Sequence, residues 1–113
     1  MIEIRTSKEF DKDFKHLSKK YPSLEHDFEI FKQVVKLNPT ANILIEWLGV
    51  GITLPVYKVK KFACKSLKST TKLRLIYVYD ANDSSIEIIE FIEFYTKSEQ
   101  ELENRERIKN YFK

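Results

Sequence analysis

The chain has 113 residues, of which 33% are charged, and its formal net charge is +3. This length suits one hydrophobic core but not two, so we expect a single domain over residues 1–113. No apolar run approaches the roughly 20 residues of a membrane span, and the first residues lack the apolar stretch of a secretory signal. We therefore expect a cytoplasmic protein with no membrane partner.

The content of metal-binding residue types is low. The chain has one cysteine, Cys64, and two histidines, His16 and His26. A single cysteine excludes an internal disulfide, and these residues lack the spacing of a zinc ligand set. We expect Cys64 to be a small buried hydrophobic residue and the histidines to lie on the surface. The sequence thus indicates neither a metal nor another cofactor.

The first half of the chain predicts a strand and two helices. Residues 2–5 alternate as a short strand does, and Ser7 stands where it would cap a helix. Apolar residues then recur every three or four positions in two segments, which end near residues 21 and 38. Each segment therefore has one buried face, formed by Phe10, Phe14, Leu17 and Tyr21 in the first helix and by Leu24, Phe28, Phe31 and Val35 in the second.

Residues 40–55 are apolar but keep neither period, so we expect a buried helical turn or an irregular strap there. Strands are predicted at residues 56–64, 72–80 and 86–95, with a turn at 81–84 and a bulge near Ile88 and Ile89. Ser98 and Glu101 have the spacing of a capping box, which predicts the start of a last helix. The order is strand, helix, helix, three strands and helix.

This order predicts an α+β domain. The two N-terminal helices should pack on one face of a largely antiparallel sheet and leave the other face open. Lys58 and Lys60 lie two residues apart on their strand and should therefore share a face. Whether Arg74 on the next strand shares that face depends on the hairpin register, which the sequence does not determine.

Positive charge is concentrated in one segment. Residues 47–79 contain seven Lys and Arg residues and no Asp or Glu. The rest of the chain contains thirteen Lys and Arg and all seventeen Asp and Glu, so it carries a net negative charge. A basic face on strands favours a phosphate backbone as partner, although lysines that protect a sheet edge from aggregation give the same pattern. The seven cations are Lys58, Lys60, Lys61, Lys65, Lys68, Lys72 and Arg74.

The three later strands resemble those of the RelE/ParE toxin superfamily, specifically its RelE-like, mRNA-cleaving branch. The similar stretches are Val-Tyr-Lys-Val-Lys at 56–60, Lys-Leu-Arg-Leu-Ile-Tyr at 72–77, Phe-Tyr-Thr-Lys at 94–97 and Asn-Arg-Glu-Arg-Ile at 104–108. The resemblance implies a RelE-like fold and a toxin of a type II toxin–antitoxin system. It also implies metal-independent endoribonuclease activity in the ribosomal A site, inhibition of translation, and a cognate antitoxin, the ribosome and mRNA as partners.

The resemblance also assigns roles to single residues. Lys58 and Lys60 match lysines that hold phosphates and help to deprotonate the attacking 2′-hydroxyl. Arg74 matches the arginine that clamps the scissile phosphate, for which a planar guanidinium suits better than an ammonium. For Lys61, Lys65, Lys68 and Lys72 we expect attraction of RNA phosphates without a chemical role.

Departures from the family pattern leave alternatives open. Lys97 stands where the prototype has a second arginine, and Tyr95 is a second candidate at the end of the same strand. For both residues an ordinary strand end is the competing interpretation. Glu103 stands where the prototype has a tyrosine, and the histidine of other branches is absent, so the general acid is unassigned.

Two other functional classes remain open. One is a protein of the toxin fold without nuclease activity, such as a ParE-like inhibitor of DNA gyrase, which the missing arginine and histidine favour. The other is a plain nucleic-acid-binding or structural domain. In each toxin case we expect the partner to bind across the basic strands from Lys58 to Arg74, with acidic side chains facing them.

Overall fold

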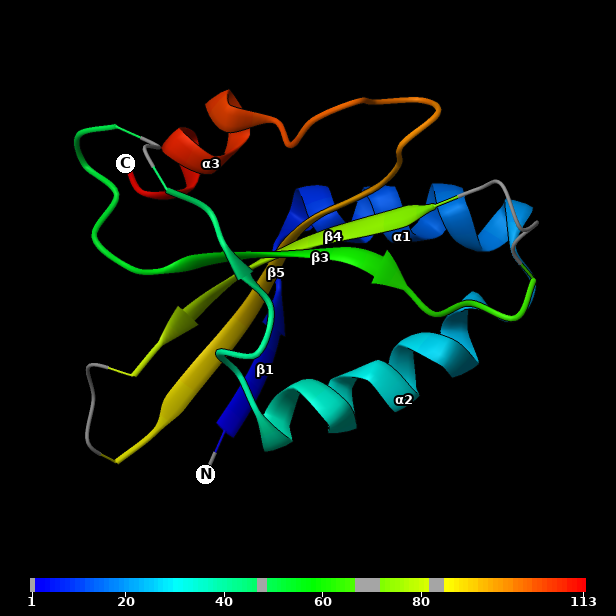
Figure 1. The fold of residues 1–113 in the computed structure, drawn as a ribbon, viewed down its shortest axis with the longest axis horizontal. Helices are drawn as coiled ribbons and strands as arrows, with labels where there is room; N and C mark the ends of the chain where they lie inside the picture. The colour runs from blue at the N-terminus through cyan, green and yellow to red at the C-terminus, as the bar shows by residue number, and fades with distance from the viewer. Residues whose placement is uncertain (1, 47–48, 67–71, 82–84) are drawn as a thin grey trace.

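The computed structural model describes residues 2–46, 49–66, 72–81 and 85–113 (Figure 1). The elements are β1 (Ile2–Thr6), α1 (Lys8–Lys20), α2 (Leu24–Leu37), β2 (Ile43–Leu44), β3 (Val56–Phe62), β4 (Leu73–Asp80), β5 (Glu87–Thr96) and α3 (Arg105–Tyr111). The strands form one mixed sheet in the order β1-β5-β4-β3-β2. β1 runs parallel to β5, and the other neighbours are antiparallel. The α+β prediction is confirmed at this level.

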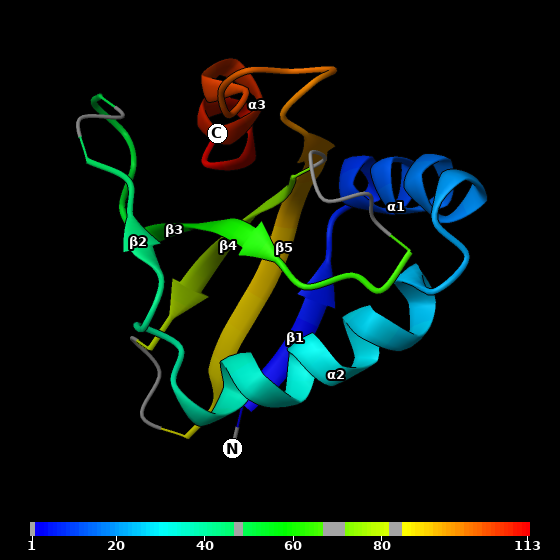
Figure 2. The same ribbon diagram turned by 45° about the vertical axis from the view of Figure 1, so that its right-hand side comes forward.

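Helices α1 and α2 cover one face of the sheet (Figures 1 and 2). As predicted, Ser7 caps α1, and its Oγ accepts a hydrogen bond of 3.1 Å from the Phe10 amide. The Phe10 ring lies at the centre of this core, 5.5 Å from the Phe28 ring and 5.6 Å from the Phe94 ring. The alternation of β4 turns its Leu73, Leu75 and Tyr77 side chains toward the helices. Aromatic packing therefore holds the two helices to the sheet.

The second face of the sheet is covered as well, so the prediction of an open face was wrong. Helix α3 and the segment that precedes β3 lie over it. They bury a smaller apolar cluster of Val56, Ile76, Val78, Ile92, Tyr95 and Ile108. All six residues from Leu73 to Val78 are buried, which is the pattern of a strand with both faces covered. The domain therefore has helices on both sides of the sheet.

The bulge in β5 lies at Ile92 and not near Ile88 and Ile89, where it was predicted. Ile76 pairs with Glu93 and Tyr77 pairs with Phe91, so Ile92 is the extra residue. Ile92 packs in the α3-side cluster, and Glu93 bonds to the chain just before α3. A bulge places consecutive side chains on one face, which explains how a carboxylate comes to lie beside that cluster.

Helix α3 begins later than the capping-box pattern predicts. Its N-cap is Asn104, whose Oδ1 accepts a hydrogen bond of 3.0 Å from the Arg107 amide. Residues 97–99 form a turn, in which Glu99 accepts a hydrogen bond from the Thr96 hydroxyl and bonds to His16 and Lys20. Glu99 therefore anchors this turn to α1, and the chain has to pass over the sheet from there before α3 starts at Arg105.

The segment from 40 to 55 holds the two-residue strand β2, whose Ile43 and Leu44 side chains are exposed. Ile45, Ile52 and Leu54 pack against the α3-side cluster. The expected helical turn is absent from the described part of this segment, which excludes residues 47 and 48. β3 ends at Phe62, two residues before the predicted end. None of the helices in the described ranges is long and apolar enough to cross a membrane.

Candidate nucleic-acid site

The strand register brings three of the predicted site residues to one face. Lys58 pairs with Ile76, and Arg74 lies two residues before Ile76 on β4, so both side chains are on the α3 side. Arg74 in turn pairs directly with Tyr95 on β5. The register that the sequence left undetermined therefore places Lys58, Arg74 and Tyr95 together.

These three side chains are buried and not exposed. The relative exposures are 7% for Lys58, 9% for Arg74 and 5% for Tyr95. The chain between β5 and α3 lies over them, because Glu93 on β5 accepts hydrogen bonds from the Gln100 side chain (2.8 Å) and the Asn104 amide (2.9 Å). The predicted partner surface across Lys58 and Arg74 is therefore not available at the surface of this conformation.

Glu103 closes the site over Lys58. The Lys58 Nζ donates a hydrogen bond of 2.9 Å to Glu103 Oε2, and both side chains are less than a tenth exposed. The Arg105 guanidinium is 3.7 Å from the other oxygen. Burial by itself would raise the pKa of Glu103, but the hydrogen bond and charge of Lys58 outweigh burial and lower this pKa. A carboxylate thus occupies the position next to Lys58 where another anion would bind.

Two buried donors beside this ion pair are unsatisfied. The Nε of Arg74 and the hydroxyl of Tyr95 have no hydrogen-bond partner among the residues that the structure describes. A buried donor without an acceptor costs roughly 1 to 3 kcal/mol. Burial, followed by the charges of Glu103 and Glu93, raises the pKa of Tyr95 to about 12, although the neighbouring Arg74 guanidinium acts in the opposite direction, so the phenol stays protonated at neutral pH. Both groups are therefore ready to donate to an anion.

The other predicted basic residues are exposed at the border of the sheet. Lys60 and Lys61 lie where the pairing of β3 with β4 is irregular. Lys72 and Lys97 flank the paired ends of β4 and β5, and the Lys97 amide donates a 3.0 Å hydrogen bond to the Lys72 carbonyl. Lys65 follows β3 and is also exposed, whereas Lys68 lies outside the described residues. Lys61 and Lys65 line a pocket beside α2, on the opposite side of the sheet from Lys58 and Arg74, so the exposed lysines do not form one site with the buried group.

Sequence reasoning missed Glu93 and Arg107. Glu93 is 1% exposed, and burial raises its pKa despite its hydrogen bonds to Gln100 and Asn104. Arg107 on α3 binds Asp13 on α1 through Nη1 at 2.6 Å and donates to the Ile92 carbonyl at 3.2 Å. The only signal for Glu93 was a carboxylate inside an apolar strand. Together these residues hold the connection to α3 in place over the site.

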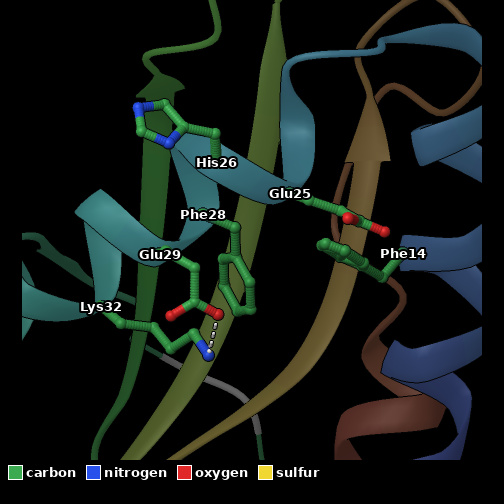
Figure 3. A pocket seen from close by; sticks show the side chains of 6 residues that line it. All are labelled: Phe14, Glu25, His26, Phe28, Glu29 and Lys32. Atoms are coloured by element: carbon green, nitrogen blue, oxygen red, sulfur yellow. Dashed lines mark ion pairs between the residues drawn. The ribbon is translucent and has the colours of Figure 1, made fainter.

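A separate pocket of about 420 Å³ lies between α1 and α2 (Figure 3). Lys32 in this pocket pairs with Glu29 at 2.8 Å, and its ammonium lies 5.0 Å from the centre of the Phe28 ring. The His26 side chain points away from the Phe14 side of the pocket (Figure 3). Within the described ranges, no three His, Cys, Asp or Glu side chains are grouped so that they could hold a metal ion. The pocket offers no set of groups suited to catalysis.

A scan against protein-family models and a search of curated proteins found no match to the chain. The geometry provides a buried guanidinium, an ammonium–carboxylate pair and a neutral phenol on one face of the sheet. Guanidinium and ammonium groups bind phosphate by charge-assisted hydrogen bonds. The chemistry of the site is therefore that of an anion site that a carboxylate of the chain partly fills.

Proposed function

We propose that the chain is a RelE-like toxin of a type II toxin–antitoxin system and acts as a metal-independent, ribosome-dependent mRNA endoribonuclease. The observation that carries the proposal is the pair of buried, unsatisfied donors, Arg74 Nε and the Tyr95 hydroxyl, on the same face as Lys58. Unsatisfied buried groups are rare in folded proteins and call for an explanation. A phosphodiester would supply the acceptors that these donors lack.

In the proposed reaction, the 2′-oxygen of the RNA forms a bond to the adjacent phosphorus and passes its proton to solvent water, a loss that the positive charges of Lys58 and Lys60 favour. The bond from phosphorus to the 5′-oxygen breaks, and the 5′-oxygen takes a proton from the Tyr95 hydroxyl, which regains one from water. Arg74 stabilises the extra negative charge of the phosphorane, which is where a preorganised donor contributes most. Lys58 orients the phosphate, and the protonated Tyr95 donates to the leaving 5′-oxygen. Lys60, Lys61, Lys65 and Lys72 attract the RNA backbone.

Access to this site requires that Glu103 leave Lys58. A phosphate and the Glu103 carboxylate are both anions that accept hydrogen bonds from an ammonium, so they compete for the same group. The Lys58–Glu103 contact is 2.9 Å in the unbound protein. The proposal therefore includes an opening of the segment between β5 and α3 before the RNA is bound.

The test is primer extension on translated messages after induction of the wild type, Arg74→Lys and the control Lys72→Ala. Arg74→Lys keeps the charge but loses the planar guanidinium that can donate two parallel hydrogen bonds, so we expect the cleavage rate to fall by a factor on the order of ten to a thousand. Lys72→Ala should weaken binding at moderate salt yet leave single-turnover cleavage on saturated ribosomes nearly intact. Thermal unfolding of Arg74→Lys separates a loss of chemistry from a loss of fold.

The nuclease proposal fails if the wild type cuts no translated message or if both variants behave alike. A second candidate would then apply: a protein of the toxin fold without nuclease activity, such as a ParE-like inhibitor of DNA gyrase. The burial of Lys58 and Arg74 and the ion pair with Glu103 favour this candidate. A supercoiling assay with gyrase distinguishes the two candidates, since only the second predicts inhibition without cleavage.

For either candidate, we propose a cognate antitoxin encoded beside the chain. Its acidic side chains would be drawn to the exposed lysines Lys60, Lys61, Lys65 and Lys72. Copurification with the neighbouring gene product tests this part of the proposal, and failure of any complex to survive purification would contradict it.

A further inference from the structure

Arg74 is a buried cation whose charge is not balanced by a neighbouring carboxylate. It is 9% exposed, and none of the ion pairs found among the described residues includes it. Lys58, by contrast, has Glu103 at 2.9 Å. An unpaired charge is far more costly to bury than a paired one. The Arg74 guanidinium therefore calls for a counter-ion in the folded protein.

A second donor lies beside this cation. Arg74 on β4 and Tyr95 on β5 are direct partners across the two strands, so their side chains are neighbours on the same face of the sheet. The Arg74 Nε and the Tyr95 hydroxyl are both buried, and neither has an acceptor in the part of the chain that the structure describes. A cation next to two unused donors has the composition of an anion site.

The chain between β5 and α3 closes this place to a polymer. The Gln100 side chain and the Asn104 amide hold this connection to Glu93, and Glu103 holds it to Lys58. An RNA strand reaches the donors only after the connection has moved, so RNA does not supply their acceptor in the closed conformation. A water molecule accepts hydrogen bonds but leaves the guanidinium charge unbalanced. A small anion meets both requirements.

The surrounding charges favour a monovalent anion. The negative charges of Glu103 and Glu93 raise the pKa of the Tyr95 hydroxyl, so both carboxylates are close enough to repel an anion beside it. This repulsion grows in proportion to the charge of the anion, which disfavours a divalent phosphate. We propose that Arg74 and the Tyr95 hydroxyl bind one halide ion, chloride in the cell, beneath the closed connection between β5 and α3.

The halide has a consequence for RNA binding that rests on the proposed function. It uses the two donors that the proposed reaction gives to the RNA, so chloride should slow cleavage more than gluconate does at equal ionic strength. The halide site itself rests on the burial of Arg74 and on the two unused donors. Its binding is measured without any cleavage, so failure of the nuclease proposal and failure of this inference are distinguishable.

The first test is thermal unfolding in sodium chloride and in sodium gluconate at equal ionic strength. A ligand that binds only the folded state raises its stability, so chloride should raise the melting temperature of the wild type above that in gluconate. Tyr95→Phe removes a hydroxyl without a partner in the described chain, so it should be as stable as the wild type in gluconate. The gain from chloride should fall by at least about half in Tyr95→Phe. Lys12→Ala, at an exposed lysine of α1, should keep the full gain.

The second test locates the ion. The line width of the chloride NMR signal should increase with added wild type, and both Tyr95→Phe and Arg74→Gln should reduce this increase. A crystal soaked in sodium bromide should show an anomalous scattering peak within hydrogen-bond distance of the Arg74 Nε and the Tyr95 hydroxyl.

The inference is overturned if chloride and gluconate stabilise the wild type equally, if Tyr95→Phe and Lys12→Ala gain equally from chloride, or if the bromide peak lies elsewhere. Density for a water molecule alone between the two donors would also overturn it. Stabilisation through Tyr95 by sodium phosphate and not by chloride has the same effect, because the site would then take an oxyanion.

Discussion

The Lys58–Glu103 pair is the residue-scale feature that decides how the site is interpreted. The resemblance to RelE-like toxins predicts that Lys58 binds phosphate, and Glu103 stands where the prototype of that family has a tyrosine. In the structure the two side chains are buried and 2.9 Å apart. Removing one member of a buried ion pair leaves an uncompensated charge, which is costlier than the net value of the pair itself.

Glu103→Gln should therefore lower the free energy of unfolding by about 2 to 4 kcal/mol, since the Lys58 ammonium would stay buried without a counter-charge. Urea denaturation at neutral pH measures this change. Glu101→Gln is the matched control, because Glu101 is exposed and its loss should cost within about 0.5 kcal/mol. Equal effects of the two substitutions would contradict the role assigned to the pair.

The pH dependence of this effect has a definite sign. Lys58 lowers the pKa of Glu103 in the folded protein below its ordinary value of 4.5. The stability that Glu103 contributes is therefore fully present above pH 4.5 and is lost as the pH falls through the lowered folded pKa. We expect the difference in unfolding free energy between wild type and Glu103→Gln to shrink below about pH 4. A difference that stayed constant down to pH 3 would contradict this assignment.

At the scale of elements, prediction from sequence succeeded where one face of an element is buried. The period of Phe10, Phe14 and Leu17 gave α1 because the other side of that helix meets water. Strands β4 and β5 were also predicted, but their second face was expected to be open, because nothing in the pattern of either strand shows that α3 covers that face. The bulge at Ile92 escaped prediction because only the pairing partner defines an extra residue.

The start of α3 was mispredicted because two polar residues met the capping pattern by spacing alone. Asn104→Ala should lower the free energy of unfolding by about 1 kcal/mol, because it removes the side chain that caps the Arg107 amide. Ser98→Ala is the comparison, and we expect a change of less than about 0.5 kcal/mol. Thermal or urea unfolding of both variants measures the difference, and a larger effect at Ser98 would restore the earlier helix start.

At the scale of the whole molecule, the site depends on packing that lies far from it in sequence. Arg107 joins α3 to Asp13 and Glu9 on α1, and Asp13 also accepts a hydrogen bond from the Phe94 amide. Sequence analysis named Lys58, Arg74 and Tyr95 as separate candidates, left their shared face undetermined and gave no sign of their burial. Burial depends on the path of the chain from 97 to 104, which local patterns do not encode.

Phe10 is the residue on which the larger core depends. Phe10→Ala should lower the free energy of unfolding by about 3 to 5 kcal/mol, because the cavity would lie among four other phenylalanine rings. Val34→Ala, at an exposed position of α2, is the control and should change stability by less than about 0.5 kcal/mol. Chemical denaturation measures both variants. A small effect at Phe10 would contradict the packing described for α1 on the sheet.

The parallel pairing of β1 with β5 has a consequence for folding during synthesis. Ile4 pairs with Ile89, so β1 cannot pair with β5 until more than eighty further residues have been synthesised. Until β5 emerges, the apolar faces of α1 and α2 lack the strand that joins them to the sheet. Contacts between such distant segments slow folding, because the intervening chain must be ordered before they form. The nascent chain therefore stays exposed to chaperones and proteases until β5 has been made.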